Sequence, residues 1–147
     1  MKCPFCRQAT TEVYNSRSTK FTSQIWRRRR CLSCSKTFTT YEWADLSFLK
    51  VKRSVAIKPV PYNRAIVFYS IYEAYLDIPH KESTVDAVTE TVEAKLLDLR
   101  SDFIKGSQIS QAVLSTLKPL STPAFLRYLS QHADLSSAKQ LKRALRS

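Results

Sequence analysis

The chain has 147 residues and is 44% hydrophobic, which suits folded structure and allows one ordinary domain or two small ones. Its 24 Lys and Arg outnumber 12 Asp and Glu, and the formal net charge of +12 favours a polyanionic partner. No run approaches about 18 uncharged apolar residues, so we expect no membrane-spanning helix. A single glycine, Gly106, excludes the glycine-rich phosphate loops of Walker and dinucleotide-binding proteins.

All four cysteines lie in two pairs, Cys3-Pro-Phe-Cys6 and Cys31-Leu-Ser-Cys34. Two Cys-x-x-Cys turns can present four thiolates to one zinc ion in a tetrahedron. Cys3, Cys6, Cys31 and Cys34 are therefore the predicted ligands of one Zn²⁺. Because four protein ligands leave no position for water, we expect this zinc to be structural rather than catalytic.

Two other uses of the cysteines are less favoured. Two disulfides would suit an extracellular protein. No apolar run follows Met1-Lys2 to serve as a signal peptide, so we do not expect an extracellular protein with disulfides. A thioredoxin-like redox pair is expected near a βαβ unit, and the first pair precedes any such unit.

Short strands are predicted between and after the cysteine pairs, at residues 11–16, 25–30 and 37–41. Together they describe a three-stranded zinc ribbon, with Phe5, Trp26 and Phe38 expected along one face. A segment of about forty residues is too short to build much core. Structural zinc contributes roughly 10–16 kcal/mol to such a fold.

The predicted change of domain lies at residues 42–50, which divides the chain into a ribbon, residues 1–46, and a second domain, residues 47–147. Residues 48–61 combine Val/Lys alternation with two prolines, as in a short hairpin. Helices are then predicted at 64–76 with Asn63 as N-cap, from Ser83 or Thr84 onward, at 107–117 ending before Pro119, from Thr122-Pro123, and at 138–146. Their apolar stripes are predicted to form the core: Val85, Val88, Val92, Leu96 and Leu99, then Ile109, Val113 and Leu117, then Phe125, Leu126 and Leu129. The predicted fold class is α+β, a zinc ribbon followed by a mainly helical domain with a short hairpin.

Positive charge is concentrated in the ribbon. Residues 1–46 and residues 47–147 each have a net charge of +6, so the first third has at least twice the charge density. Arginine suits phosphate and guanine because its planar fork makes bidentate hydrogen bonds. A solvated face or a localisation signal could also account for the arginine run, but we favour nucleic-acid binding. The predicted contacts are Arg17, Lys20, Arg27, Arg28, Arg29, Arg30 and Lys36.

Several motifs resemble the bacterial NrdR family of transcriptional repressors of ribonucleotide reductase genes. These are M-K-C-P-F-C at the start, N-S-R at residues 15–17, R-R-R-R-C at 27–31, C-L-S-C at 31–34 and F-T-T-Y-E at 38–42. Asn15 stands where the family usually has Asp. The resemblance implies a cytoplasmic, nucleoid-associated repressor, not an enzyme, that binds double-stranded promoter DNA as a homo-oligomer.

The second domain resembles the family's ATP-cone with less fidelity. Val51-Lys52-Arg53, Pro59 and Arg64 agree with that module, whereas Val60 and Pro61 depart from it. The resemblance implies that ATP or dATP acts as an allosteric ligand that sets the oligomeric state. Lys52, Arg53 and Arg64 are the predicted phosphate contacts, although each could equally be a surface cation.

Two other functions compete with a DNA-binding repressor. A zinc ribbon can also bind RNA or RNA polymerase, with the helical domain serving only for oligomerisation. An enzyme is disfavoured because no carboxylate cluster for Mg²⁺ accompanies the basic residues. The two histidines, His80 and His132, lie far apart without a nucleophile partner and are predicted to be surface or capping residues.

Overall fold

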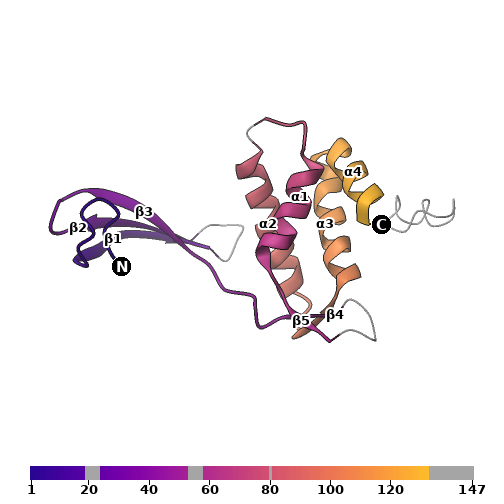
Figure 1. Cartoon of the computed structure of the whole chain (residues 1–147), viewed down its shortest axis with the longest axis horizontal. Helices are drawn as coiled ribbons and strands as arrows, with labels where there is room; N and C mark the ends of the chain where they lie inside the picture. Colours follow the sequence, from indigo (N-terminus) through magenta and orange to yellow (C-terminus); the bar gives the residue numbers. More distant parts are fainter. Residues whose placement is uncertain (19–23, 53–57, 80, 133–147) are drawn as a thin grey trace. The chain divides into compact units, whose positions relative to one another are not determined.

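The computed structural model describes residues 1–18, 24–52, 58–79 and 81–132. The chain forms two compact units, Met1–Asp45 and Leu46–Ser147, here called the ribbon unit and the helical unit. Strands and a four-cysteine cluster make up the first, and four helices with a small sheet make up the second, which confirms the α+β class (Figure 1). None of the described helices is long and apolar enough to cross a membrane.

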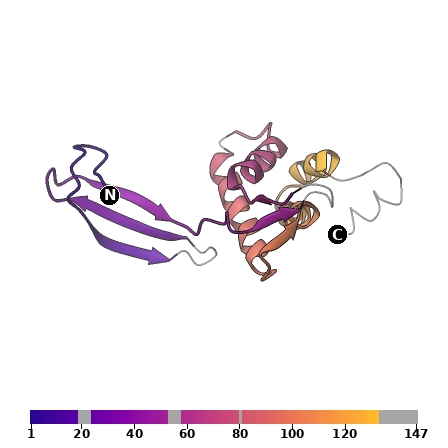
Figure 2. The same cartoon turned by 60° about the horizontal axis from the view of Figure 1, so that its bottom comes forward.

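The ribbon unit is a three-stranded antiparallel sheet of β1 (Thr11–Ser18), β2 (Ile25–Cys31) and β3 (Thr37–Glu42). The arginine-rich β2 lies in the middle, and Figure 2 shows the three strands side by side with the cysteine turns at one end. All three predicted strands are confirmed. A bulge interrupts the pairing of β1 between Val13 and Asn15.

The sequence predicted that Phe5, Trp26 and Phe38 lie along one face of the ribbon, but the structure does not place them so. Trp26 pairs with Tyr41, and Phe38 pairs with Arg29. Because successive side chains of a strand point to opposite faces, the odd spacing between Trp26 and Arg29 puts Trp26 and Phe38 on opposite faces. Phe5 is 54% exposed. The prediction of one packed aromatic face was therefore wrong.

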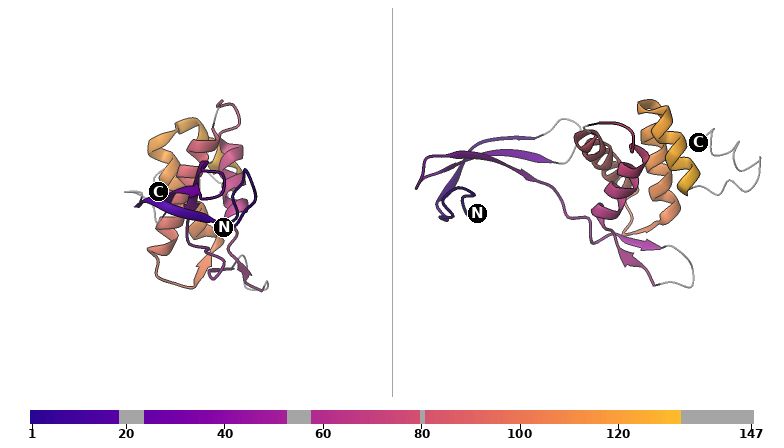
Figure 3. Two further views of the ribbon diagram at one scale, coloured as in Figure 1. Left: turned by 90° about the vertical axis from the view of Figure 1, so that its left-hand side faces the viewer. Right: turned by 45° about the horizontal axis from the view of Figure 1, so that its top comes forward.

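In the helical unit, a second sheet lies at one end of the helices (Figures 1 and 3). It contains β4 (Lys50–Lys52) and β5 (Val60–Pro61), which confirm the predicted hairpin. A third strand, β6 (Phe103–Lys105), pairs parallel to β4 and was not predicted. Its three residues are too few to show alternation, and only Ile104 is buried.

The described part of the helical unit contains four helices: α1 (Arg64–Ala74), α2 (Glu82–Leu97), α3 (Gly106–Leu120) and α4 (Thr122–His132). The neighbours α1–α2, α2–α3, α3–α4 and α1–α4 pack against one another. Their buried side chains form one apolar cluster, which also includes Leu46, Leu49 and Val51 from the preceding segment. This cluster is the core of the helical unit.

Several predicted helix boundaries need correction. Asn63 is the N-cap of α1, and its side chain accepts a hydrogen bond from the Ala65 amide at 2.9 Å, as predicted. The helix ends at Ala74, two residues before the predicted end. The N-cap of α2 is Lys81, rather than Ser83 or Thr84. The next helix, α3, continues through Pro119 to Leu120 instead of ending before the proline.

The predicted core stripes are confirmed at most positions. In α2, Val85, Val88, Val92 and Leu96 are buried. Leu99 lies beyond the end of that helix and is 42% exposed, and Leu126 in α4 is 48% exposed, so these two assignments were wrong. The predicted helix at 138–146 lies outside the described residues.

Candidate metal centre and nucleic-acid interface

The four thiols meet at one end of the ribbon sheet. The ligand atoms of Cys3, Cys6, Cys31 and Cys34 all lie within 4.8 Å of one another. The Sγ atoms are 3.7 Å apart in the pair Cys3–Cys34 and 3.5 Å apart in Cys6–Cys31. Four sulfurs at about 2.3 Å from a zinc ion define a tetrahedron with edges of about 3.8 Å. This geometry suits zinc, whereas a disulfide requires a sulfur–sulfur distance of about 2.05 Å.

The two cysteine turns have the same backbone geometry. The amide of the residue after each turn donates to the carbonyl of its first cysteine at 2.9 Å, from Arg7 to Cys3 and from Ser35 to Cys31. Both residues are left-handed, with φ of 62° at Arg7 and 58° at Ser35. Glycine usually marks such positions, and because neither residue is a glycine, the left-handed backbone could not be predicted from the sequence.

Backbone amides of the turns point at the sulfurs. The Phe5 amide donates to Cys3 Sγ at 3.4 Å. Burial alone would raise the pKa of Cys31, but backbone hydrogen bonds at Cys34 and Ser33, together with the Cys6 and Cys34 thiols, outweigh it and lower that pKa to about 6. The neighbouring thiols shift the pKa of Cys6 in the opposite direction, so the lowering applies to Cys31. Thiolate is the form that binds a metal, so these amides favour the species that zinc requires.

The four arginines of β2 divide between the two faces of the sheet. Arg28 and Arg30 share a face with Trp26, and Arg27 and Arg29 lie on the other. Two of the four are neutralised within the ribbon. Arg27 pairs with Glu42 at 2.6 Å, and Arg30 pairs with Glu12 at 2.7 Å. Arg27 and Arg30 therefore have a carboxylate partner within the ribbon and do not need an external anion.

Arg28 and Arg29 contact hydroxyl groups instead of carboxylates. The Arg28 guanidinium donates to Thr39 at 3.1 Å and to Thr37 at 2.9 Å, and Arg29 donates to Thr40 at 3.1 Å. A threonine hydroxyl orients a guanidinium without cancelling its charge. Arg28 and Arg29 are therefore held in place by uncharged partners among the described residues, and their positive charge is not cancelled by them.

The remaining predicted DNA contacts are spread over the ribbon. Arg17 pairs opposite Trp26 in the sheet and is exposed. The ammonium of Lys36 lies 4.9 Å from the centre of the Phe5 ring, a cation–π contact next to the metal centre. Lys20 lies outside the described residues.

Two of the predicted phosphate contacts of the helical unit, Arg64 and Lys52, lie in the described part of the chain, and both contact other side chains there. Arg64 donates to Glu93 and, at 2.6 Å, to Asp86, and Tyr62 donates to the same Glu93 at 3.1 Å. Burial alone would lower the pKa of Arg64, but these carboxylates outweigh it and shift it upward. Lys52 lies 4.9 Å from the centre of the Phe103 ring. Arg53 lies outside the described residues.

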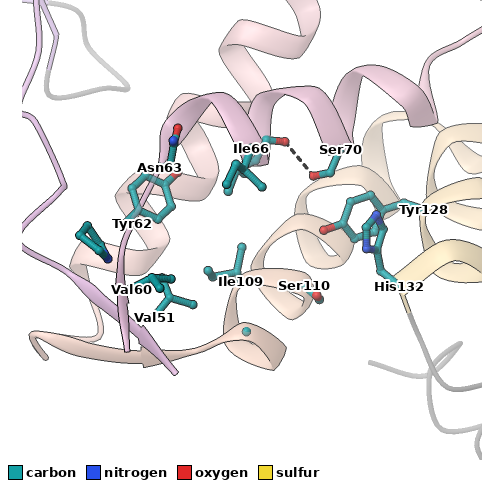
Figure 4. Close-up of a pocket in the computed structure, with 13 residues that line it drawn as sticks. Val51, Val60, Tyr62, Asn63, Ile66, Ser70, Ile109, Ser110, Tyr128 and His132 are labelled. Atoms are coloured by element: carbon teal, nitrogen blue, oxygen red, sulfur yellow. Dashed lines mark hydrogen bonds between the residues drawn. The ribbon is translucent and has the colours of Figure 1, made fainter. Parts of the chain in front are cut away.

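A cavity of about 270 Å³ opens between the small sheet and the helices α1, α3 and α4 of the helical unit (Figure 4). Neither Lys52 nor Arg64 lines it. His132 does, and its ring packs on that of Tyr128 with centroids 4.2 Å apart. It is an exposed residue of α4, as predicted for a surface histidine. The other histidine, His80, lies outside the described residues.

Four cysteines at one end of a three-stranded sheet define the ribbon unit as a zinc ribbon. Residues 1–42 match the family described as "Transcriptional repressor NrdR-like, N-terminal domain". The chain is 36% identical over 130 residues to the transcriptional repressor NrdR of Verminephrobacter eiseniae. The aligned segment covers 88% of this chain and 87% of that protein. It is 32% identical over 145 residues to the NrdR of Cupriavidus metallidurans, which covers 99% and 93%.

The similarity spans both units. The NrdR of Polaromonas naphthalenivorans is 32% identical over 142 residues, or 97% of this chain and 95% of its own length. The chain therefore belongs to the NrdR family of transcriptional repressors. Membership supports a structural zinc at the four cysteines and DNA as a partner.

Proposed function

We propose that this protein is a zinc-dependent transcriptional repressor that binds the promoter DNA of ribonucleotide reductase genes through β2 of its ribbon. The relatives are named as transcriptional repressors. The observation that carries the proposal is the state of Arg28 and Arg29, which threonines orient but do not neutralise. Cys31, at the end of the same strand, ties these arginines to the thiol cluster.

In this proposal zinc at Cys3, Cys6, Cys31 and Cys34 holds the ribbon rigid, so that the guanidinium groups meet DNA at fixed positions. Arg28 and Arg29 make the first contacts, to phosphate or to guanine. Arg17 and Lys36 add phosphate contacts, as Lys20 was predicted to do. Arg27 and Arg30 contribute only where a phosphate displaces their carboxylates. Such a protein would act at the bacterial nucleoid.

The experiment is a salt titration of binding to promoter duplex and to random duplex. We expect Arg28→Ala and Arg29→Ala each to weaken binding and to lower the slope of log K against log salt by about one unit. The double variant Arg27→Ala/Glu42→Ala is the matched control, because it removes one arginine of the same strand without changing the net charge. Equal slopes in the wild type and in both single variants would place the DNA elsewhere.

The second candidate is a ribbon that binds RNA or RNA polymerase, and exposed aromatics favour it. Tyr14 and Tyr41 are 54% and 53% exposed, and Trp43 is 56% exposed. Exposed aromatic rings can stack on unpaired bases. Competition separates the two candidates: specific promoter binding survives excess random duplex and single-stranded RNA, whereas an RNA-binding ribbon is displaced by the RNA.

The proposal extends to control of the assembly by nucleotides. We infer that the helical unit carries a homo-oligomer, and that ATP or dATP shifts its assembly by binding one oligomeric state more tightly than another. Lys52, Arg53 and Arg64 stay the predicted phosphate contacts. Calorimetry with ATP and dATP, combined with light scattering, tests this: if neither nucleotide binds or changes the mass, the helical unit serves only as a scaffold.

A further inference from the structure

The bulge in β1 decides which of its side chains share a face of the sheet with Arg28. The register shifts between Val13 and Asn15, so Tyr14 is an extra residue without a counterpart in β2. Because side chains alternate along a strand, the extra residue moves the rest of β1 to the face opposite the one that unbroken pairing would give. Asn15 therefore lies opposite Arg28 and on the same face of the sheet.

This face, here called the reading face, carries Asn15, Arg17, Trp26, Arg28, Thr39 and Tyr41. Its central row, from β1 to β3, consists of Asn15, Arg28 and Thr39. The Arg28 guanidinium donates to Thr39 at 3.1 Å and to Thr37 at 2.9 Å. Hydroxyls of β3 thus hold Arg28 from one side, and the partly exposed amide of Asn15 lies on its other side.

The next row of the reading face adds a cation and two aromatic rings. Arg17, Trp26 and Tyr41 lie opposite one another on β1, β2 and β3. Arg17 and Tyr41 are exposed, and Trp26 is partly exposed. Apolar side chains contact the methyl group of thymine in the major groove, whereas amides and guanidinium groups bond to the edges of purines. The reading face offers all three kinds of group.

The opposite face of the same strands is less suited to base recognition. Arg27 and Arg29 lie there with Glu42, whereas the reading face and its edge hold three arginines, Arg17, Arg28 and Arg30, with one glutamate, Glu12. In these strands the reading face thus has the larger positive charge. Ser16 stands opposite Arg27 where the reading face has the carboxamide of Asn15 opposite Arg28. Charge and hydrogen-bonding groups therefore both favour the reading face.

We propose that the reading face lies against the major groove and that Asn15 determines sequence specificity by recognising adenine. A carboxamide accepts from N6 of adenine and donates to N7, a pattern that distinguishes adenine from the other bases. Arg28 makes the corresponding bidentate contact to guanine, and Arg29, on the opposite face, is left for phosphate. This inference rests on the proposed DNA binding and names the side chain that reads a base.

The test uses the full-length zinc-loaded protein and the promoter duplex of a ribonucleotide reductase gene. Its adenines are replaced one at a time by 7-deazaadenine, which keeps the base pair but lacks the N7 acceptor. At one adenine or more we expect the analogue to weaken wild-type binding by about tenfold. Asn15→Ala should bind about tenfold more weakly and should not respond to the analogue there. Ser16→Ala, the matched control on the opposite face, should respond as the wild type does.

Asn15→Asp gives a second readout that a change in stability would not produce. A carboxylate accepts from the N4 amino group of cytosine, whereas it cannot donate to N7 of adenine. Selection from a random duplex library should therefore replace adenine by cytosine at the affected position. Zinc content shows whether each variant keeps a folded ribbon.

The outcomes separate this inference from the proposed function. A wild type that tolerates the analogue at every adenine would overturn the role of Asn15 without need of a variant. Unchanged base preference in Asn15→Ala would overturn it too, while lower salt slopes in Arg28→Ala and Arg29→Ala would still support DNA binding by the ribbon. Equal binding of the wild type to promoter and random duplex would overturn both. An analogue effect that Asn15→Ala abolishes, with the switch to cytosine in Asn15→Asp, supports the inference.

Discussion

The ribbon unit and the helical unit bury very different material. Among the described residues of 1–45, only Cys3 and Cys31 are buried, and both belong to the thiol cluster. The helical unit instead buries a continuous set of aliphatic and aromatic side chains, among them Ile71, Val92 and Leu117 with no exposed surface. A bound metal would take the place of a core in the first unit, whereas an apolar core stabilises the second.

Charge is tolerated in these units where burial is low. The central strand β2 carries four consecutive arginines because its side chains stay partly exposed and several reach hydroxyls or carboxylates. In the helical unit, one network of partly buried charge is formed by Arg64, Asp86, Glu93 and Tyr62, where each charge has a partner. Each unit should therefore fail independently, for its own physical reason.

The largest effect is expected from Cys31→Ser. Loss of one zinc ligand should unfold the ribbon and abolish DNA binding while the helical unit stays folded. Both tryptophans, Trp26 and Trp43, lie in the ribbon unit, so their fluorescence follows its unfolding, and circular dichroism follows the helices. Retained DNA binding in this variant would refute the role of the metal.

Leu117→Ala tests the helical unit in the same assay. Leu117 is fully buried in α3, so we expect the helical transition to lose about 2–5 kcal/mol of unfolding free energy through the lost contacts and the cavity. Tryptophan fluorescence and zinc content should remain those of the wild type. A parallel loss of zinc would show that the stabilities of the two units are coupled, contrary to the expectation that each unit unfolds independently.

Arg64→Met tests the polar network of the helical unit. It removes the cationic partner of Glu93, whose side chain is only 14% exposed, and keeps the aliphatic stem. We expect a loss of about 1–3 kcal/mol in the helical transition. Burial already raises the pKa of Glu93 and Arg64 opposes this, so the variant should recover part of its stability as the pH falls and Glu93 is protonated. A deficit that is the same at every pH would contradict this explanation.

The smallest effect is expected from Asn63→Ala. The variant loses the hydrogen bond from the Ala65 amide to the Asn63 side chain and should cost about 1 kcal/mol of helical stability. Asn63→Asp is the matched control, because aspartate keeps an acceptor at the N-cap. Urea denaturation of the two variants measures the difference, and equal stability would show that the cap contributes nothing.

The sequence predicted the ribbon well because its signals are local. Cysteine spacing defined the metal cluster, and turn and strand propensities located β1, β2 and β3. Pairing register is not local, so the sequence revealed neither the separation of Trp26 from Phe38 nor the ion pairs of Arg27 and Arg30. Those follow from which residues of β1 and β3 lie opposite β2.

In the helical unit the apolar periodicity identified the helices, but tertiary contacts decided the details. The parallel strand β6 depends on β4, some fifty residues earlier, and has no pattern of its own. Lys81 is the N-cap of α2 although its side chain has no oxygen to accept a hydrogen bond. Its ammonium lies 3.9 Å from the centre of the Tyr72 ring and donates a hydrogen bond to the Leu76 carbonyl. The cavity likewise combines five elements that are distant in sequence.

The central claim is that zinc makes the arginine strand rigid enough to bind DNA, and a measurement on the metal centre tests it most directly. X-ray absorption at the zinc edge of the purified full-length protein, together with metal analysis, should show one zinc per chain bound by four sulfurs at about 2.3 Å. DNA binding should disappear when a chelator removes that zinc and return when zinc is restored. Protein that binds promoter DNA while its cysteines are joined in disulfides and no stoichiometric zinc is present would contradict the account.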